Sequence, residues 1–382
     1  MISPVVVFLL GLNLRPAVTS LGVTLPDIAV PGWAAALLVA LPLWACGIGA
    51  LLTRSRGGVR AALAVLAFAL SIRVLGGLAV MVAGTALACL AIARIGTVLP
   101  VLARGSRRLS ACYTVALGCG STAGALVTPW VVSRSSWQLG LSGWTLLPVM
   151  ALLFWRHDTP TIGQVRPLSL RHNGTAWALT VYFGLVSTVT FLVMGWLPEI
   201  LRAAGLSAGA AGACLGLAMV MGLPMMWFVP LWAHRWMLVV VTVPSVVSVV
   251  GLLVAPAVLP WLWSALLGIG IGGLALALTC IPMRAGADRS VTAALSAMVQ
   301  GGGYLIAGVG ALACGLVHGL THDWRASLAM ILIVLCGQVG AGLLAVRPVV
   351  VRPRASPGPQ PDHPRHQPHL VDVPDVRLHE PR

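Results

Sequence analysis

Long apolar runs dominate the chain, and short polar or Pro/Gly-rich breaks separate them. A typical run holds about 20 residues, enough for one helix to cross a hydrocarbon core of about 30 Å. The pattern predicts an all-α membrane protein with twelve transmembrane helices, at 4–25, 33–53, 59–76, 78–102, 110–132, 138–155, 174–197, 208–232, 236–255, 258–282, 291–317 and 325–346.

The twelve spans fall into two groups of six, because the longest internal polar break is residues 156–173. Short motifs recur in the same order in both groups: Leu25-Pro26-Asp27-Ile28 ends the first span, and Leu197-Pro198-Glu199-Ile200 ends the seventh. This recurrence predicts parallel repeats related by an axis along the membrane normal. The predicted parts are an N-terminal half (1–155), a central cytoplasmic loop (156–173), a C-terminal half (174–346) and a disordered cytoplasmic tail (347–382).

Basic residues lie mainly in alternate breaks. With the N-terminus in the cytoplasm, the inner loops hold most of the arginines, whereas the outer loops hold only Arg134, Arg202 and Arg325. This bias predicts that both termini are cytoplasmic and that the protein is multi-pass in the inner (cytoplasmic) membrane. Arg73, near the end of the third predicted span, is expected to snorkel toward the outer face.

Composition agrees with a membrane protein and excludes a soluble domain, since 58% of the residues are hydrophobic and 9% are charged. The net charge of +15 comes from 24 basic residues, all arginine, against nine acidic ones, and most of the arginines sit in short gaps between the apolar segments. That distribution fits an inner-face charge bias, so we expect no nucleic-acid partner. The eight cysteines lie in apolar segments without metal-ligand spacing, and neither a metal nor another cofactor is expected.

The first span contains Asn13-Leu14-Arg15-Pro16, which places Arg15 about 15 Å into the membrane if a single helix starts near Pro4. An arginine at this depth costs about 2.5–3.5 kcal/mol on insertion scales, so it normally faces a bundle interior or a wet cavity. Arg15 and Asn13 are therefore candidates to bind a small anion or polar solute. The alternative is that Arg15 only satisfies carbonyl groups of neighbouring helices.

The Asn13-to-Pro16 motif resembles the major facilitator superfamily, and within it the cyanate and 2-nitroimidazole transporter (CynX/NimT) group. So do Trp196-Leu197-Pro198 with the following Gly205-Leu206-Ser207, and the run from Ala294 to Tyr304. The resemblance implies twelve helices in two domains, a central cavity and alternating access. The chain departs from the group's pattern before the fourth-span proline, where it reads Ile95-Gly96-Thr97, and in the seventh span, where it has Val186 and Phe191.

Further polar residues are candidates for the same site, each with a structural alternative. Thr19 is one turn from Arg15 and could line the cavity or bond to its own helix. Arg94 could be a second cavity charge or could snorkel toward the inner face. Tyr113, Gln300 and Tyr304 could bind the substrate or form hydrogen bonds between helices.

Acidic groups limit the mechanism, because none of the nine lies at mid-membrane and no histidine does either. Asp27 and Glu199, at outer helix ends, are the only plausible acids for gating or proton coupling; otherwise transport is facilitated diffusion or exchange. No nucleophile, metal cluster or carboxylate pair supports an enzyme.

The sequence thus predicts a monomeric secondary transporter in the lipid bilayer that moves a small polar or anionic organic solute, cyanate-like, by alternating access. The alternatives are an exporter of uncharged drug-like compounds such as nitroimidazoles, a channel, or a decayed homologue that does not transport.

Overall fold

The computed structural model describes residues 3–28, 32–52, 58–155, 170, 172–232, 234–286, 288–349 and 351. Every regular element in these ranges is helical. The predicted central loop (156–173) and tail (347–382) lie almost entirely outside the described residues.

The N-terminal half contains eight α-helices and two 3₁₀ turns in its described residues. They are α1 (Pro4–Leu12), α2 (Pro16–Thr24), η1 (Leu25–Asp27), α3 (Gly32–Leu52), α4 (Val59–Ile72), α5 (Leu78–Leu102), α6 (Arg107–Val132), α7 (Trp137–Ser142), η2 (Gly143–Thr145) and α8 (Leu146–Phe154). The described C-terminal half consists of α9 (Gly174–Ala203), α10 (Ala208–Leu231), α11 (Trp236–Val254), α12 (Pro260–Ala285), α13 (Arg289–Thr321) and α14 (Trp324–Ala345).

These elements make the twelve predicted spans, because α1 with α2 forms the first span and α7 with η2 and α8 forms the sixth. Ten of the resulting helices are long and apolar enough to cross a membrane, and the apolar parts of α3 and α4 supply shorter segments. The prediction of an all-α, twelve-span membrane fold in two six-helix halves is confirmed.

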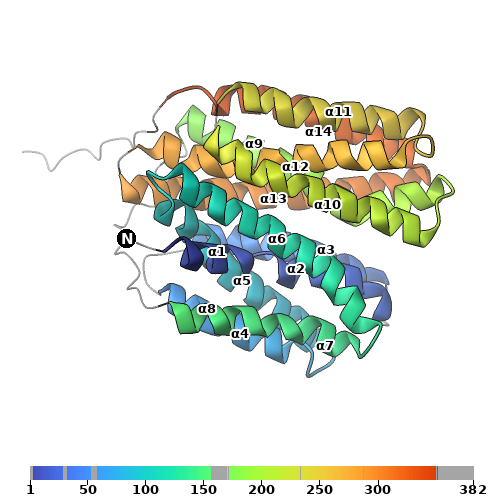
Figure 1. Ribbon diagram of the computed structural model, residues 1–382, viewed down its shortest axis with the longest axis horizontal. Helices are drawn as coiled ribbons and strands as arrows, with labels where there is room; N and C mark the ends of the chain where they lie inside the picture. The colour runs from blue at the N-terminus through green and yellow to red at the C-terminus, as the bar shows by residue number, and fades with distance from the viewer. Residues whose placement is uncertain are drawn as a thin grey trace, which may run out of the picture.

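The two halves lie side by side, with α1 to α8 below and α9 to α14 above in Figure 1. Each half packs mainly within itself, for example α3 and α4 against α5, and α9 against α13 and α14. Between the halves, α6 packs along α10 and α3 along α13, while α5 contacts α12 and α13. Small residues allow the close approaches: a Cβ at Gly47 of α3 would lie 3.0 Å from the Gly301 carbonyl of α13.

The first span is not the single helix that the sequence predicts. The α-helix ends at Leu12, and a second one starts at Pro16. Pro16 has no N–H to bond to the Leu12 carbonyl, and a proline disfavours helical geometry in the residue before it. Arg15 has φ −117° and ψ −38°, still in the right-handed helical region, and stands at the start of α2 rather than inside a helix.

Candidate functional site

Arg15 lies at the break in the first span and faces the interface between the halves. Its side chain is only 5% exposed, and its guanidinium carbon lies 5.1 Å from the ring centre of Phe191 on α9. No group in the described part of the chain accepts a hydrogen bond from this guanidinium or pairs with its charge. A guanidinium carries five N–H donors and remains charged, so this one lacks acceptors that a ligand or water could provide.

Two small cavities flank Arg15, each of about 20 Å³, which is room for about one water molecule. Cavity 1 lies between α2, α3, α5, α9 and α13, and its walls are Leu14, Arg15, Val18, Pro42, Leu43, Cys46, Ile92, Ala93, Gly96, Phe191, Gln300 and Tyr304. Cavity 2 lies between α6, α9, α10 and α12, and its walls are Arg15, Gly118, Ser121, Thr122, Thr190, Met194, Met219, Gly222, Met226, Ile271 and Leu274.

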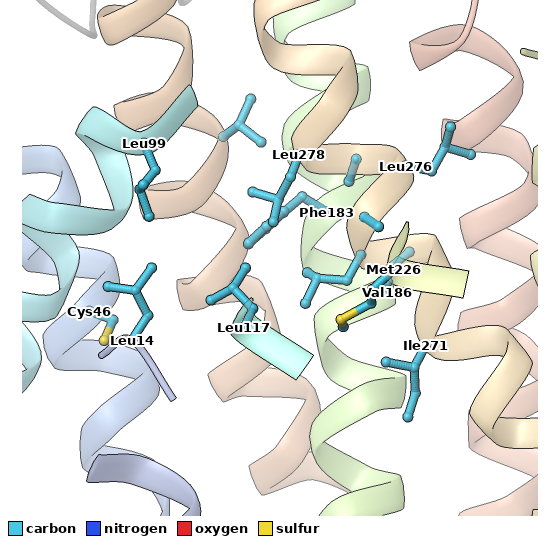
Figure 2. Close-up of a cluster of buried hydrophobic side chains, with 14 of the residues drawn as sticks. Leu14, Cys46, Leu99, Leu117, Phe183, Val186, Met226, Ile271, Leu276 and Leu278 are labelled. Carbon is cyan, nitrogen blue, oxygen red and sulfur yellow. The ribbon is translucent and has the colours of Figure 1, made fainter. Parts of the chain in front are cut away.

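Figure 2 labels two apolar wall residues of each cavity within the buried cluster: Leu14 and Cys46 of cavity 1, and Met226 and Ile271 of cavity 2. Arg15 is the residue that the two cavities share.

Gln300 contributes an acceptor to cavity 1. Its amide nitrogen donates to the Gly96 carbonyl at 3.0 Å and to the Ser296 hydroxyl at 2.8 Å. Both amide hydrogens are thereby used, so the group left for a ligand is the side-chain carbonyl. Cavity 1 therefore offers donors from Arg15 and an acceptor from Gln300. Tyr304 completes this wall and packs edge-on against Phe183, with ring centres 5.1 Å apart.

Cavity 2 is lined by hydroxyl groups and three methionines. The hydroxyl of Thr122 is buried and has no hydrogen-bond partner among the described residues, whereas that of Thr190 bonds to the Val186 carbonyl of its own helix. Methionine side chains are flexible and polarisable, so this wall can adapt its shape to a small ligand.

Two hydrogen bonds join the halves at backbone carbonyls that lack a helical partner. In each case a proline four residues later has no N–H to donate. In α5 the Gly96 carbonyl has no helical donor, because the residue four places on is Pro100, and Gln300 of α13 donates to it. In α10 the Met226 carbonyl faces Pro230 in the same way, and the Thr114 hydroxyl of α6 donates to it at 2.6 Å.

These bonds lie toward the end of the bundle where α5 and α10 end and α6 begins. At that end Arg107 also donates to the Leu231 carbonyl across the interface, at 3.0 Å. The halves are therefore joined by hydrogen bonds on this side of Arg15.

No family model matches the chain. The uncharacterized transporter YycB of Bacillus subtilis (strain 168) is 29% identical over 370 residues, which covers 88% of this chain and 92% of the relative. The cyanate transport protein CynX of Escherichia coli (strain K12) is 28% identical over 351 residues, or 84% of this chain and 90% of the relative. The 2-nitroimidazole transporter of the same organism is 30% identical over 260 residues, or 64% of this chain and 66% of the relative.

Among solved structures, the major facilitator superfamily proton:xylose symporter XylE aligns with a TM-score of 0.71 at 13% identity, over 89% of this chain and 94% of that one. The human organic anion transporter MFSD10 aligns with a TM-score of 0.65 at 14% identity, over 90% and 100%. The chain belongs to the major facilitator superfamily. Within the superfamily it is a secondary transporter similar to the cyanate and 2-nitroimidazole transport proteins, and not an enzyme.

The structure brings three of the predicted site residues together at cavity 1: Arg15, Gln300 and Tyr304. Phe191, noted in the sequence as a departure from the group's pattern, is the ring that contacts Arg15. The hydroxyl and methionine wall of cavity 2 was not predicted, because Ser, Thr and Met carry no signal of depth or facing in an apolar helix.

Asn13, Thr19, Arg94 and Tyr113 line neither cavity. The Asn13 amide donates to the Leu9 carbonyl at 2.7 Å, and the Thr19 hydroxyl donates to the Arg15 carbonyl at 3.1 Å. The Tyr113 hydroxyl is buried and has no partner among the described residues. Arg94 lies one turn from the outward-facing side chain of Leu90.

The two candidate acids lie away from the cavities, at the end of the bundle where α2 and α9 terminate. Asp27 ends η1 and is exposed. Glu199 forms an exposed ion pair with Arg202, with an N–O distance of 3.1 Å.

Arg73 corrects a sequence expectation, since it does not snorkel but is fully buried. Its guanidinium donates to the Ala17 carbonyl at 2.9 Å and to the Leu141 carbonyl at 3.0 Å. It thus ties α2 and α7 to the end of α4. This buried arginine has protein acceptors, in contrast to Arg15.

Proposed function

We propose that the protein transports a small polar or anionic organic solute of cyanate-like size across the cell membrane by alternating access, with Arg15 binding the substrate. The observation that carries this proposal is a central, buried guanidinium that has no acceptor in the described protein and that borders two small cavities. A fixed positive charge in such surroundings attracts an anion far more strongly than it would in water.

The geometry supports a specific binding mode. Phe191 holds one face of the guanidinium, so an anion approaches its N–H edge from cavity 1 or cavity 2. The Gln300 carbonyl then accepts from any N–H or O–H of the substrate. The substrate itself balances the charge of Arg15, and the small volume of each cavity favours a substrate of few atoms.

Alternating access is supported by the distribution of polar contacts between the halves. The hydrogen bonds through Gly96, Met226 and Leu231 lie on the side of Arg15 that the arginine bias assigns to the cytoplasm. In this arrangement the cytoplasmic side is closed, and transport requires those bonds to break.

Proton coupling is not required by the site, because the described residues that line the two cavities include no carboxylate and no histidine. We propose facilitated diffusion or exchange. If coupling exists, it acts through Asp27 or Glu199 at the outer mouth, and Asp27→Asn with Glu199→Gln would remove it.

Uptake into proteoliposomes tests the proposal, with labelled cyanate and small carboxylates, and with a pH gradient imposed or collapsed. We expect saturable uptake that falls at least tenfold in Arg15→Ala and recovers in part in Arg15→Lys. The matched control is Arg134→Ala, because Arg134 also stacks on an aromatic ring, that of Trp130 at 4.5 Å, but on the exposed surface. Absence of uptake by folded wild-type protein, or wild-type uptake by Arg15→Ala, would refute the proposal.

A second candidate is export of uncharged planar compounds such as nitroimidazoles, which the methionine wall of cavity 2 favours. In that case Arg15→Ala would change folding more than transport, and Met219→Ser would reduce export.

A further inference from the structure

Two cysteines from neighbouring helices meet beside cavity 1. The Cys46 thiol on α3 donates to the Cys89 carbonyl on α5 at 3.5 Å, which brings the two cysteines side by side. Cys46 is 6% exposed and lines cavity 1 together with Arg15, whereas Cys89 is 1% exposed and lies behind it. Figure 2 shows the Cys46 sulfur beside Leu14, another wall residue of that cavity.

The packing of α3 on α5 holds the pair together. One turn beyond Cys46, a Cβ at Gly49 would lie 2.9 Å from the Cβ of Ala93, so the helices approach closely there. Neighbouring thiols fixed on rigid helices are already placed to act as a bidentate ligand, and soft thiolate ligands select soft, thiophilic elements.

We propose that Cys46 and Cys89 form a dithiol site that opens onto cavity 1 and binds soft thiophilic elements, with trivalent arsenic as the probe. Methylarsonous acid reacts with two thiols by exchange: both As–OH bonds break, two As–S bonds form, and the two thiol protons leave in two water molecules. The oxidation state of arsenic does not change, and the reaction does not need a thiolate. Pyramidal As(III) binds two sulfurs from neighbouring residues, and the contact of the Cys46 thiol with the Cys89 backbone makes these two cysteines neighbours.

Occupancy of the site would block transport, because cavity 1 has a volume of only about 20 Å³ and Arg15 and Gln300 line its walls. An anion bound at Arg15 would in turn slow the reaction of Cys46.

The test measures arsenic bound per chain after one equivalent of methylarsonous acid and gel filtration, with the full-length reduced protein in detergent. We expect one arsenic per wild-type chain, none in Cys46→Ala or Cys89→Ala, and one in the matched control Cys336→Ala, which changes an exposed cysteine on α14. 2,3-Dimercaptopropanol should remove the arsenic. Wild-type protein without arsenic, or either single variant retaining it, overturns the site.

Uptake assays test the link to the cavity. The arsenical should abolish wild-type uptake and leave uptake by Cys89→Ala unchanged, since Cys89 lies behind cavity 1 and does not line it. If a chain with arsenic bound at Cys46 and Cys89 took up substrate at the wild-type rate, the claim that the dithiol site opens onto cavity 1 would be wrong. The binding assay needs no transport, so its result is independent of the function proposed above.

Discussion

The hydrogen bond from Thr114 to Met226 should help to hold the two halves together, and Thr114→Val removes it with almost no change of shape. Thr114 is fully buried, and its hydroxyl lies 2.6 Å from the Met226 carbonyl. That carbonyl cannot bond within its own helix, because Pro230 has no N–H. In the variant it is left without a donor for as long as the halves stay closed, whereas water can reach it when they separate.

The size of the effect follows from hydrogen-bond energies. Interhelical hydrogen bonds in membranes contribute about 0.6 kcal/mol on average and at most about 1.7 kcal/mol, and an unsatisfied buried carbonyl costs about 1–3 kcal/mol. A net change of about 1 kcal/mol corresponds to roughly a fivefold change in an equilibrium constant. We therefore expect Thr114→Val to raise the ratio of separated to closed halves about fivefold.

Electron–electron distance measurements can detect this shift. Nitroxides attached through non-canonical residues at the exposed positions Arg108, on α6, and Arg235, at the start of α11, would report the separation of the two halves and leave the native cysteines in place. The matched control is Thr279→Val, because within the described residues the buried Thr279 hydroxyl bonds only to the Ala275 carbonyl of its own helix. A folded Thr114→Val protein with the wild-type distance distribution, or an equal shift in the control, would refute the reasoning.

Three further predictions concern stability, measured as thermal unfolding in nanodiscs. Arg73→Ala should destabilise the N-terminal half by about 3 kcal/mol, because it removes two buried hydrogen bonds from a charged donor; unchanged unfolding would contradict this role. Gly120→Ala should destabilise the packing of α6 against the break in the first span, since the new Cβ would lie 2.7 Å from the Leu12 carbonyl. The control Gly22→Ala on α2 has open space around the new Cβ, so it should be neutral or stabilising. Asp288 caps α13, and hydrogen bonds from Ser290 lower the pKa of its carboxyl group below the usual 3.8. The capping contribution is therefore present above that ordinary pKa and lost as the pH falls through the lowered value, so the stability difference between wild type and Asp288→Ala should shrink in acid.

The sequence predicted the twelve spans well, because each needs only a local apolar run and a polar break. It also predicted a charged centre, because an arginine in the middle of a span is rare enough to stand out. The sequence did not predict which way individual side chains point from their helices. Arg15 lies in the middle of its predicted span and Arg73 near the end of its own, yet both are buried: Arg15 contacts the Phe191 ring, and Arg73 binds carbonyls of α2 and α7. The rotation of each helix against its neighbours decides this, and packing between distant segments sets that rotation.

The helix prolines show how local and distant information combine. Pro100 and Pro230 each leave the carbonyl four residues earlier without a helical hydrogen-bond donor. The positions of the prolines in the sequence are enough to predict this. Their donors, Gln300 and Thr114, belong to the opposite half, and nothing local connects them to those carbonyls. A carbonyl that accepts its hydrogen bond from a donor in the same half would keep that bond throughout a transport cycle. Because these two carbonyls accept hydrogen bonds across the interface, the alternating access proposed above would let each bond exist only while that side is closed. The energy that keeps it closed would then depend on polar groups that water can satisfy when the halves part.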